Sequence, residues 1–226
     1  MSFSSDIKEK LCAVEFNGDA EIMSEIAGAF RISGVTENQE IRFSASGEAY
    51  AKRLSQNIEK LYNTKVDISR KGNNFLVTVR DNKVIGEILS ELLEEEFLEG
   101  ESCENAFLRG AFLSGGSVSD PEKSWHIEFD THYIEEAEFI CELLEARDVR
   151  CGISERKGRF VVYSKDCDSI ATILGSIGAG ADALQLFEIQ VERRMRNDIN
   201  RRINFESANL DKSIKAASKH IHAVKL

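Results

Sequence analysis

The sequence predicts an α+β fold in which two tandem αββαββα units lie about a pseudo-twofold axis and are followed by a C-terminal helical extension. Three observations support this prediction: a repeated segment, a second series of elements in the same order, and apolar residues at helical spacing near the C-terminus. The 226 residues, 42% hydrophobic and 30% charged, are typical of a soluble globular protein. Because neither a signal peptide nor a membrane span is predicted, we expect a cytoplasmic protein without membrane contact.

The repeat is the strongest of these observations. The segment IAGAFRISGV (residues 26–35) recurs as LRGAFLSGGSV (residues 108–118), and Gly28 falls on Gly110 at an offset of 82. The predicted strands, the hairpin and the helix after it recur at offsets of 83 to 86. We therefore expect a first repeat over 1–95, a second repeat over 96–180 and a basic helical extension over 181–226.

Periodicity predicts the elements of each repeat. Apolar residues at helical spacing predict a helix over 20–32, which Asp19 caps and Gly34 ends. Polar and apolar residues alternate over 40–44 and predict a strand, and Gly72 suits the positive φ of a hairpin turn. The further expected elements are, in order, helix 47–62, strands 64–69 and 74–80, helices 82–93 and 103–115, strand 124–130, helix 133–146, a hairpin over 149–164 and helix 167–177.

Small residues stand at every fourth position on the first helix of each repeat. A ridge without large side chains lets another backbone approach closely. We therefore expect the two helices to pack against each other at Gly28 and Gly110. The two ridges consist of Ala20, Ser24 and Gly28, and of Ala106, Gly110 and Ser114.

The cysteines and histidines do not have the spacing of a metal or redox site. The five cysteines include no CxxC pair, so we expect reduced and mostly buried thiols. The sequence contains no phosphate-binding loop and no nucleophile motif, and the histidine pairs lack metal-ligand spacing. We expect no cofactor, no bound metal and no catalytic residue. The cysteines are Cys12, Cys103, Cys141, Cys151 and Cys167.

Charge is distributed unevenly along the chain. Residues 193–226 hold nine Lys and Arg against three acids, a net charge of +6. Since the whole chain has a net charge of −10, the rest of the chain carries −16. The extension is predicted to form one helix with Arg194 and Arg201 on one face, then a second helix over 208–224. Ile189, Met195, Ile199 and Ile203 are expected to pack on the body.

Two motifs resemble known families. GAFRISG and GAFLSGG, each at the end of a helix, resemble the two LAGLIDADG motifs of single-chain homing endonucleases. FLRGAFLSGGSVSDPEKSWHIEF and MRNDINRRINFESANLDKSIKAA resemble the WhiA family of bacterial sporulation and cell-division regulators, and this resemblance covers nearly the whole chain. The second of these motifs is the more specific, because the endonucleases do not share it.

The resemblance implies a scaffold without nuclease chemistry. In the endonucleases the eighth motif position is an acid, and the pair of carboxylates holds divalent metal for phosphodiester hydrolysis. The matching positions here are Ser33 and Gly115. Neither supplies the anionic ligand that a hard cation needs. Asp120 and Glu37 are the nearest acids in sequence and fall beyond the helix ends.

The WhiA resemblance further implies a non-catalytic, DNA-binding transcription regulator that acts in sporulation, cell division and chromosome segregation at the nucleoid. In that family DNA is bound mainly by a helix-turn-helix domain after the residues matched here, and this chain ends at Leu226. The scaffold is then expected to contact a protein. Two alternatives remain open: a degenerate or active endonuclease, and a pure protein-interaction module. The candidates for contact with nucleic acid or a partner are Arg193, Arg194, Arg196, Asn197, Asn200, Arg201, Arg202 and Asn209.

Overall fold

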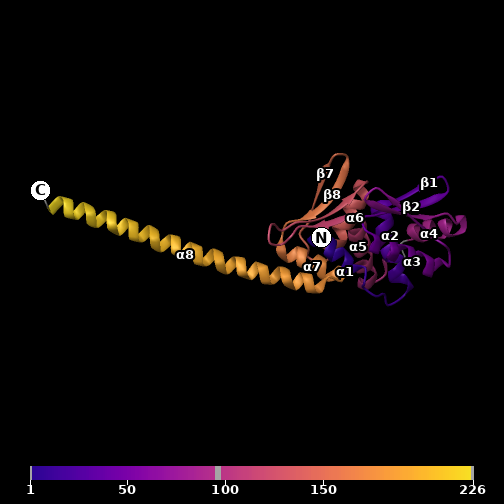
Figure 1. The fold of residues 1–226 in the computed structure, drawn as a ribbon, viewed down its shortest axis with the longest axis horizontal. Helices are drawn as coiled ribbons and strands as arrows, with labels where there is room; N and C mark the ends of the chain where they lie inside the picture. Colours follow the sequence, from indigo (N-terminus) through magenta and orange to yellow (C-terminus); the bar gives the residue numbers. More distant parts are fainter. Residues whose placement is uncertain (1, 95–97, 225–226) are drawn as a thin grey trace. The chain divides into compact units, whose positions relative to one another are not determined.

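Each repeat folds into a four-stranded antiparallel sheet with helices packed against it (Figure 1). The computed structural model describes residues 2–94 and 98–224, with side chains described up to residue 217. The first repeat contains α1 (Phe3–Leu11), α2 (Asp19–Ser33), β1 (Gly34–Glu37), β2 (Glu40–Ala45), α3 (Glu48–Tyr62), β3 (Asp67–Lys71), β4 (Asn74–Val79) and α4 (Asn82–Glu94). Its strand order is β1-β2-β4-β3.

The second repeat has the same topology. It contains α5 (Glu101–Gly115), β5 (Gly116–Val118), β6 (Ile127–Thr131), α6 (Ile134–Glu145), β7 (Gly152–Arg156), β8 (Arg159–Ser164) and α7 (Cys167–Ile177). The strand order β5-β6-β8-β7 repeats that of the first sheet. The predicted fold class is therefore confirmed.

The core lies between α2, α5 and the inner faces of the two sheets. Equivalent aromatic pairs join helix to sheet in both repeats. Phe30 meets Phe43 edge to face at 6.1 Å, and Phe112 meets Phe129 in the same way at 5.9 Å. Such a pair contributes about 0.5–1.5 kcal/mol beyond the burial of its surface. The sequence repeat is thus also a repeat of packing.

Several predicted boundaries differ from the structure. Helix α1 was not predicted. Asp19 is the first residue of α2 and does not cap it, because Gly18 occupies the N-cap position and the Glu21 carboxylate accepts the backbone and side-chain N–H groups of Asn17. Strand β1 directly follows α2, and β3 starts three residues later than predicted.

The extension is one continuous helix, α8 (Gly180–Val224), of 45 residues, and the prediction of two helices was wrong. Residues 181–226 contain no glycine or proline, so nothing in their backbone interrupts the helix. Of the apolar residues expected to pack on the body, Ile189 is buried, whereas Met195, Ile199 and Ile203 are 61%, 57% and 54% exposed. The glycine-rich segment before α8 ends α7, with Gly178 in the left-handed region at φ 105°.

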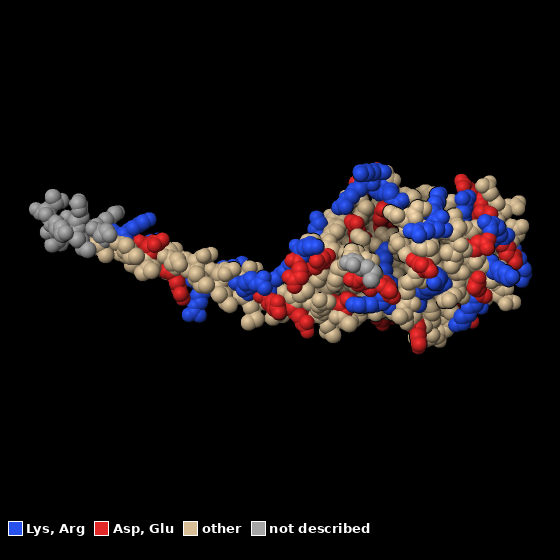
Figure 2. Space-filling view, in the orientation of Figure 1, with Lys and Arg blue, Asp and Glu red and all other residues tan. Residues whose placement is uncertain are grey.

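The chain divides into a compact unit, Met1–Leu186, and a helical unit, Phe187–Leu226. Figure 2 shows basic and acidic side chains interspersed on both units. Among the described residues, no helix combines the length and the apolar character needed to cross a membrane.

Candidate functional site at the paired helix ends

The backbones of α2 and α5 are in direct contact at the two motif glycines. A Cβ atom added at Gly28 would lie 2.1 Å from the Phe107 carbonyl oxygen of α5. A Cβ atom added at Gly110 would lie 2.0 Å from the Glu25 carbonyl oxygen of α2. Since real Cβ atoms do not approach backbone so closely, only glycine fits at either position.

Of the two positions where the endonuclease motif has a carboxylate, Ser33 carries a hydroxyl group and Gly115 has no side chain. The Ser33 hydroxyl at the end of α2 donates to the Ser114 hydroxyl at the end of α5 over 3.4 Å, and Ser114 bonds the Tyr50 hydroxyl at 2.7 Å. Burial raises the pKa of Tyr50, so its phenol stays protonated. Three neutral hydroxyls cannot replace the anionic oxygen ligands of a divalent cation.

Gly115 lies where no side chain fits. An added Cβ atom would meet the Ile32 side chain at 2.4 Å and the Asp130 carbonyl oxygen at 2.8 Å. An aspartate at this position would therefore require the helix end or β6 to move. The acids near the helix ends bond locally: Glu37 pairs with Arg42 at 2.8 Å, and Asp120 pairs with Lys123 at 3.3 Å.

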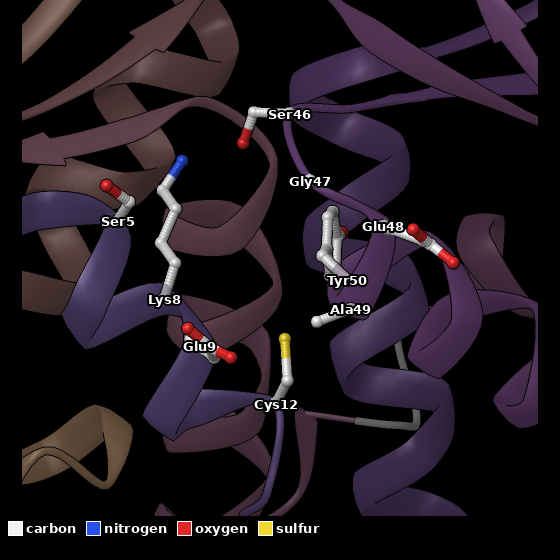
Figure 3. A pocket seen from close by; sticks show the side chains of 9 residues that line it. All are labelled: Ser5, Lys8, Glu9, Cys12, Ser46, Gly47, Glu48, Ala49 and Tyr50. Atoms are coloured by element: carbon white, nitrogen blue, oxygen red, sulfur yellow. The ribbon is translucent and has the colours of Figure 1, made fainter. Parts of the chain in front are cut away.

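A cavity of about 260 Å³ adjoins the end of α5 (Figure 3). Lys8 of α1 lines it and donates to the Leu113 carbonyl oxygen at 3.1 Å. Burial lowers the pKa of Lys8 to about 8, and burial raises the pKa of Cys12 on the same wall to about 11. A lysine that bonds the carboxyl end of α5 places positive charge there, where the helix dipole is negative. Any cation at this helix end would be repelled by a protonated Lys8.

Sequence reasoning missed Lys8 because α1 was not predicted. The signal available in the sequence was the pair Ile7 and Leu11, both fully buried, which stand four residues apart as on one face of a helix. Tyr50, which lines the same cavity, was missed as well, because it contacts Ser114 across 64 residues of sequence.

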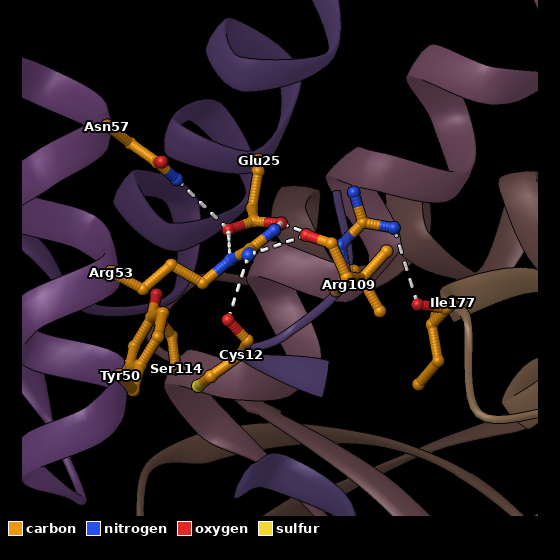
Figure 4. A network of polar contacts seen from close by, with 9 residues as sticks. Cys12, Glu25, Tyr50, Arg53, Asn57, Arg109, Ser114 and Ile177 are labelled. Carbon is orange, nitrogen blue, oxygen red and sulfur yellow. Dashed lines mark hydrogen bonds and ion pairs between the residues drawn. The ribbon is translucent and has the colours of Figure 1, made fainter. Parts of the chain in front are cut away.

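A buried ion cluster lies in the α2–α5 interface (Figure 4). The fully buried Glu25 carboxylate accepts from Arg53 of α3 at 2.6 and 2.8 Å and from Arg109 of α5 at 2.6 Å. Asn57 adds a weaker contact at 3.3 Å. Both guanidinium groups also lie against the Phe16 ring, at 4.3 and 5.4 Å from its centroid. Two cations share one carboxylate here, so Glu25 supplies the counter-charge for one buried guanidinium group from each repeat.

The predicted contact residues of the extension lie on α8. Seven of the eight are exposed, and Arg193 is half-buried. Arg201 lies 3.9 Å from Asp198, and Arg202 pairs with Glu206 at 3.1 Å. At 100° per residue, Arg194 and Arg201 share one side of the helix whereas Arg196 and Arg202 do not. The basic residues therefore surround α8 and form no single face.

The hairpin turns carry basic residues that sequence reasoning did not select. Both repeats have Arg-Lys-Gly at the turn, and Arg70, Lys71, Arg156 and Lys157 are exposed. A group of basic side chains covers the end of the β7–β8 hairpin in Figure 2. The sheet faces themselves carry paired charges, as for Arg159 with Asp130 at 2.6 Å. The recurrence of Arg-Lys-Gly in both repeats was a signal in the sequence that could have identified these residues.

We expect Gly28→Ala to lower the free energy of unfolding by about 1–3 kcal/mol or more, the range for overpacking a core. The matched control is Gly86→Ala in α4, where an added Cβ atom meets nothing within 4 Å. This control should gain about 0.5–1 kcal/mol, since alanine favours a helix over glycine. Urea unfolding of both variants provides the measurement, and equal effects would show that the close approach is not required.

We expect Glu25→Gln to lower the free energy of unfolding by about 3–5 kcal/mol, the range for breaking a buried ion pair on one side. The amide keeps the shape and leaves both guanidinium groups without a counter-charge. Urea unfolding measures this loss, with Glu48→Gln as the control, because the Glu48–Lys52 pair is exposed on both sides. A loss no larger than that of the control would contradict the assigned role of Glu25.

Comparisons with known proteins agree on one family. The chain matches the WhiA LAGLIDADG-like domain over residues 23–98 and 104–196. It is 33% identical to a probable cell division protein WhiA of Alkaliphilus metalliredigens, over 99% of this chain and 79% of that protein. It is 34% identical to the protein of the same name from Ruminiclostridium cellulolyticum, over 100% of this chain and 79% of that protein.

Solved structures extend the comparison to the fold. Full-length DUF199/WhiA from Thermatoga maritima superposes with a TM-score of 0.80 at 26% identity, covering 100% of this chain and 79% of that chain. I-DmoI, solved in complex with DNA and Mn, superposes with a TM-score of 0.56 at 15% identity, covering 71% of this chain and 98% of that chain. The second likeness shows the fold alone. By the matched domain and by these relatives, the chain belongs to the WhiA family.

Proposed function

We propose that this chain is the LAGLIDADG-like scaffold of a non-catalytic, DNA-binding transcription regulator of the WhiA type, which acts in cell division, sporulation and chromosome segregation at the nucleoid of the cytoplasm. The observation that carries the non-catalytic part is Gly115, where a carboxylate has no room. The relatives are named as cell division proteins, which supports the cellular role. In a regulator of this type, sequence recognition falls mainly to a helix-turn-helix domain.

The chemistry of the helix ends supports a scaffold over an enzyme. Metal-dependent hydrolysis needs anionic ligands that hold the cation and activate water. Ser33, Ser114 and Tyr50 form a closed set of neutral hydroxyl contacts. Lys8 adds positive charge at the end of α5. The scaffold keeps the helix packing of the endonuclease fold and lacks its acids.

Contact with DNA is assigned to the basic residues of α8, all exposed except the half-buried Arg193, and to the exposed cations of the hairpin turns. Lys and Arg that neutralise phosphates release counterions, and this release drives binding. The residues of α8 are Arg193, Arg194, Arg196, Arg201 and Arg202, with Asn197, Asn200 and Asn209 as polar neighbours. The net charge of −16 outside residues 193–226 opposes binding over the sheet faces.

A protein partner is the second candidate, and a specific observation favours it. Val191, Met195, Ile199 and Ile203 are all more than half exposed on α8 and follow one another at four-residue spacing. Exposed apolar side chains in a contiguous row mark interaction surfaces. A scaffold that only contacts protein would bind no DNA through its arginines.

We expect no cleavage of supercoiled plasmid by this protein with magnesium or manganese, because the helix ends hold no anionic ligand. Ser33→Asp restores one carboxylate and should also remain inactive, since Gly115 supplies no second one. Agarose gels of the plasmid provide the readout. Cleavage that EDTA abolishes would indicate a metal-dependent nuclease. If the cleavage rate also changes in the Ser33→Ala, Tyr50→Phe double variant, the activity belongs to this protein and not to a contaminating nuclease.

We expect the full chain to retard duplex DNA in a gel at low salt, with retention that weakens as salt rises. Replacing the five arginines of α8 with glutamine should flatten the slope of log K against log salt by about 4–5 if each contacts one phosphate. Lys83→Gln with Lys123→Gln is the control, since these lysines are 85% and 81% exposed elsewhere on the body.

A third variant with Arg70, Lys71, Arg156 and Lys157 changed to glutamine divides the DNA contact between α8 and the hairpin turns. Whichever variant flattens the salt slope carries the contact. No retardation at low salt by the unmodified chain would contradict DNA contact and leave the protein-interaction module.

A further inference from the structure

A pair of thiols lies in the second repeat, away from the helix ends. Cys141 stands near the end of α6, Cys151 directly precedes β7, and their Sγ atoms are 2.9 Å apart. Both residues are free cysteines, and both are half-buried. The expectation of mostly buried thiols is therefore wrong for three of the five, since Cys12 is also half-buried.

The connection between the two thiols is held in place by hydrogen bonds. The Val149 N–H donates to the Leu144 carbonyl oxygen at 3.1 Å, which turns the chain back at the end of α6. Arg150 is fixed on both sides, because its N–H donates to Ser169 at 3.0 Å and its carbonyl oxygen accepts from Ser164 at 2.6 Å. Cys151 follows this anchored residue, so its position opposite α6 is set by the fold.

A carboxylate completes the group. Glu145 stands four residues after Cys141 and so lies on the same side of α6. Its Oε1 atom is 3.7 Å from the Cys141 Sγ, and the three ligand atoms of Cys141, Glu145 and Cys151 all lie within 4.8 Å of one another. Thiolate sulfur and carboxylate oxygen are ligands that zinc accepts together in proteins.

In the absence of a metal ion the surroundings keep both thiols protonated. Burial, the Cys151 thiol and the Glu145 carboxylate all raise the pKa of Cys141, and burial raises the pKa of Cys151. Each influence disfavours a second negative charge beside Glu145. A bound divalent cation reverses this, because it stabilises the thiolates and releases their protons.

We propose that Cys141, Cys151 and Glu145 form a binding site for a thiophilic divalent cation of the zinc class, with three protein ligands and one open coordination position. In a tetrahedral site with Zn–S bonds of about 2.3 Å the two sulfurs lie roughly 3.7–3.8 Å apart. The observed pair needs to open by less than about 1 Å, which a side-chain adjustment of a half-exposed cysteine supplies.

The alternative use of two adjacent thiols is a disulfide. A disulfide would require an oxidant and would bring the sulfurs to about 2.05 Å. It would use only the two cysteines, whereas the group contains a third donor in reach of both. The presence of Glu145 therefore favours the cation, and the disulfide becomes an outcome of the test.

Cobalt(II) titration of the reduced full chain tests the site, because thiolate-to-cobalt charge transfer and intense ligand-field bands report tetrahedral sulfur coordination. We expect binding of one equivalent. Cys141→Ser and Cys151→Ser should each reduce the charge-transfer absorption by about half and weaken binding, and the double variant should lose it. Glu145→Gln should keep the absorption and weaken binding. Cys12→Ser, another half-buried cysteine, is the control and should bind cobalt unchanged.

Thiol counting with Ellman's reagent separates the two chemistries. With zinc, the reagent should react with two fewer thiols in the native protein, and EDTA should restore them. In the unreduced, denatured protein all five cysteines should then react. If only three thiols react, and dithiothreitol but not EDTA restores the other two, the cysteines form a disulfide and the proposal is overturned. Cobalt bands that are absent, or that persist in the double variant, would overturn it as well.

Discussion

The contact between the backbones of α2 and α5 determines both the buried ion cluster and the geometry of the two helix ends. At Gly28 and Gly110 one additional carbon would lie about 2 Å from a carbonyl oxygen of the other helix. This approach brings Arg109 of the second repeat to Glu25 of the first, across 84 residues of sequence. It also places Ser33 beside Ser114. Stability and the geometry of the helix ends thus have the same origin.

Much of the fold was predictable, because the same pattern occurs twice and each copy supports the other. The errors have local causes. Helix α1 begins in a polar segment, and its core contribution rests on two residues, Ile7 and Leu11. Helix α8 was predicted as two helices, but residues 204–207 between them are compatible with a helix, and the structure is continuous there. Helix α2 starts one residue earlier than predicted, so Gly18 and not Asp19 is the N-cap residue.

The site was predictable only where a motif marks it. Ser33 and Gly115 follow from alignment with the motif, but the lack of space at Gly115 depends on Ile32 and Asp130, which only the fold brings there. Lys8 donates to Leu113 across 105 residues of sequence, and no local sequence pattern predicts such a contact. Cys141 and Cys151 escaped a search for CxxC pairs because a folded connection, not a short spacing, brings them together.

The charges of this scaffold differ from those that a nuclease of the same fold requires, although its helix packing is the same in kind. A nuclease of this fold needs acids at the helix ends and cations over its sheets, since it must hold both metal and a polyanion. Here the helix ends carry hydroxyls, and the sheet cations are paired with neighbouring acids, as Arg80 is with Glu40 and Asp67. The two glycines and the buried cluster hold the packing of the repeats together. Basic residues are exposed at the hairpin turns and along α8, and some of them pair with nearby acids, as Arg156 does with Glu128 and Arg202 with Glu206.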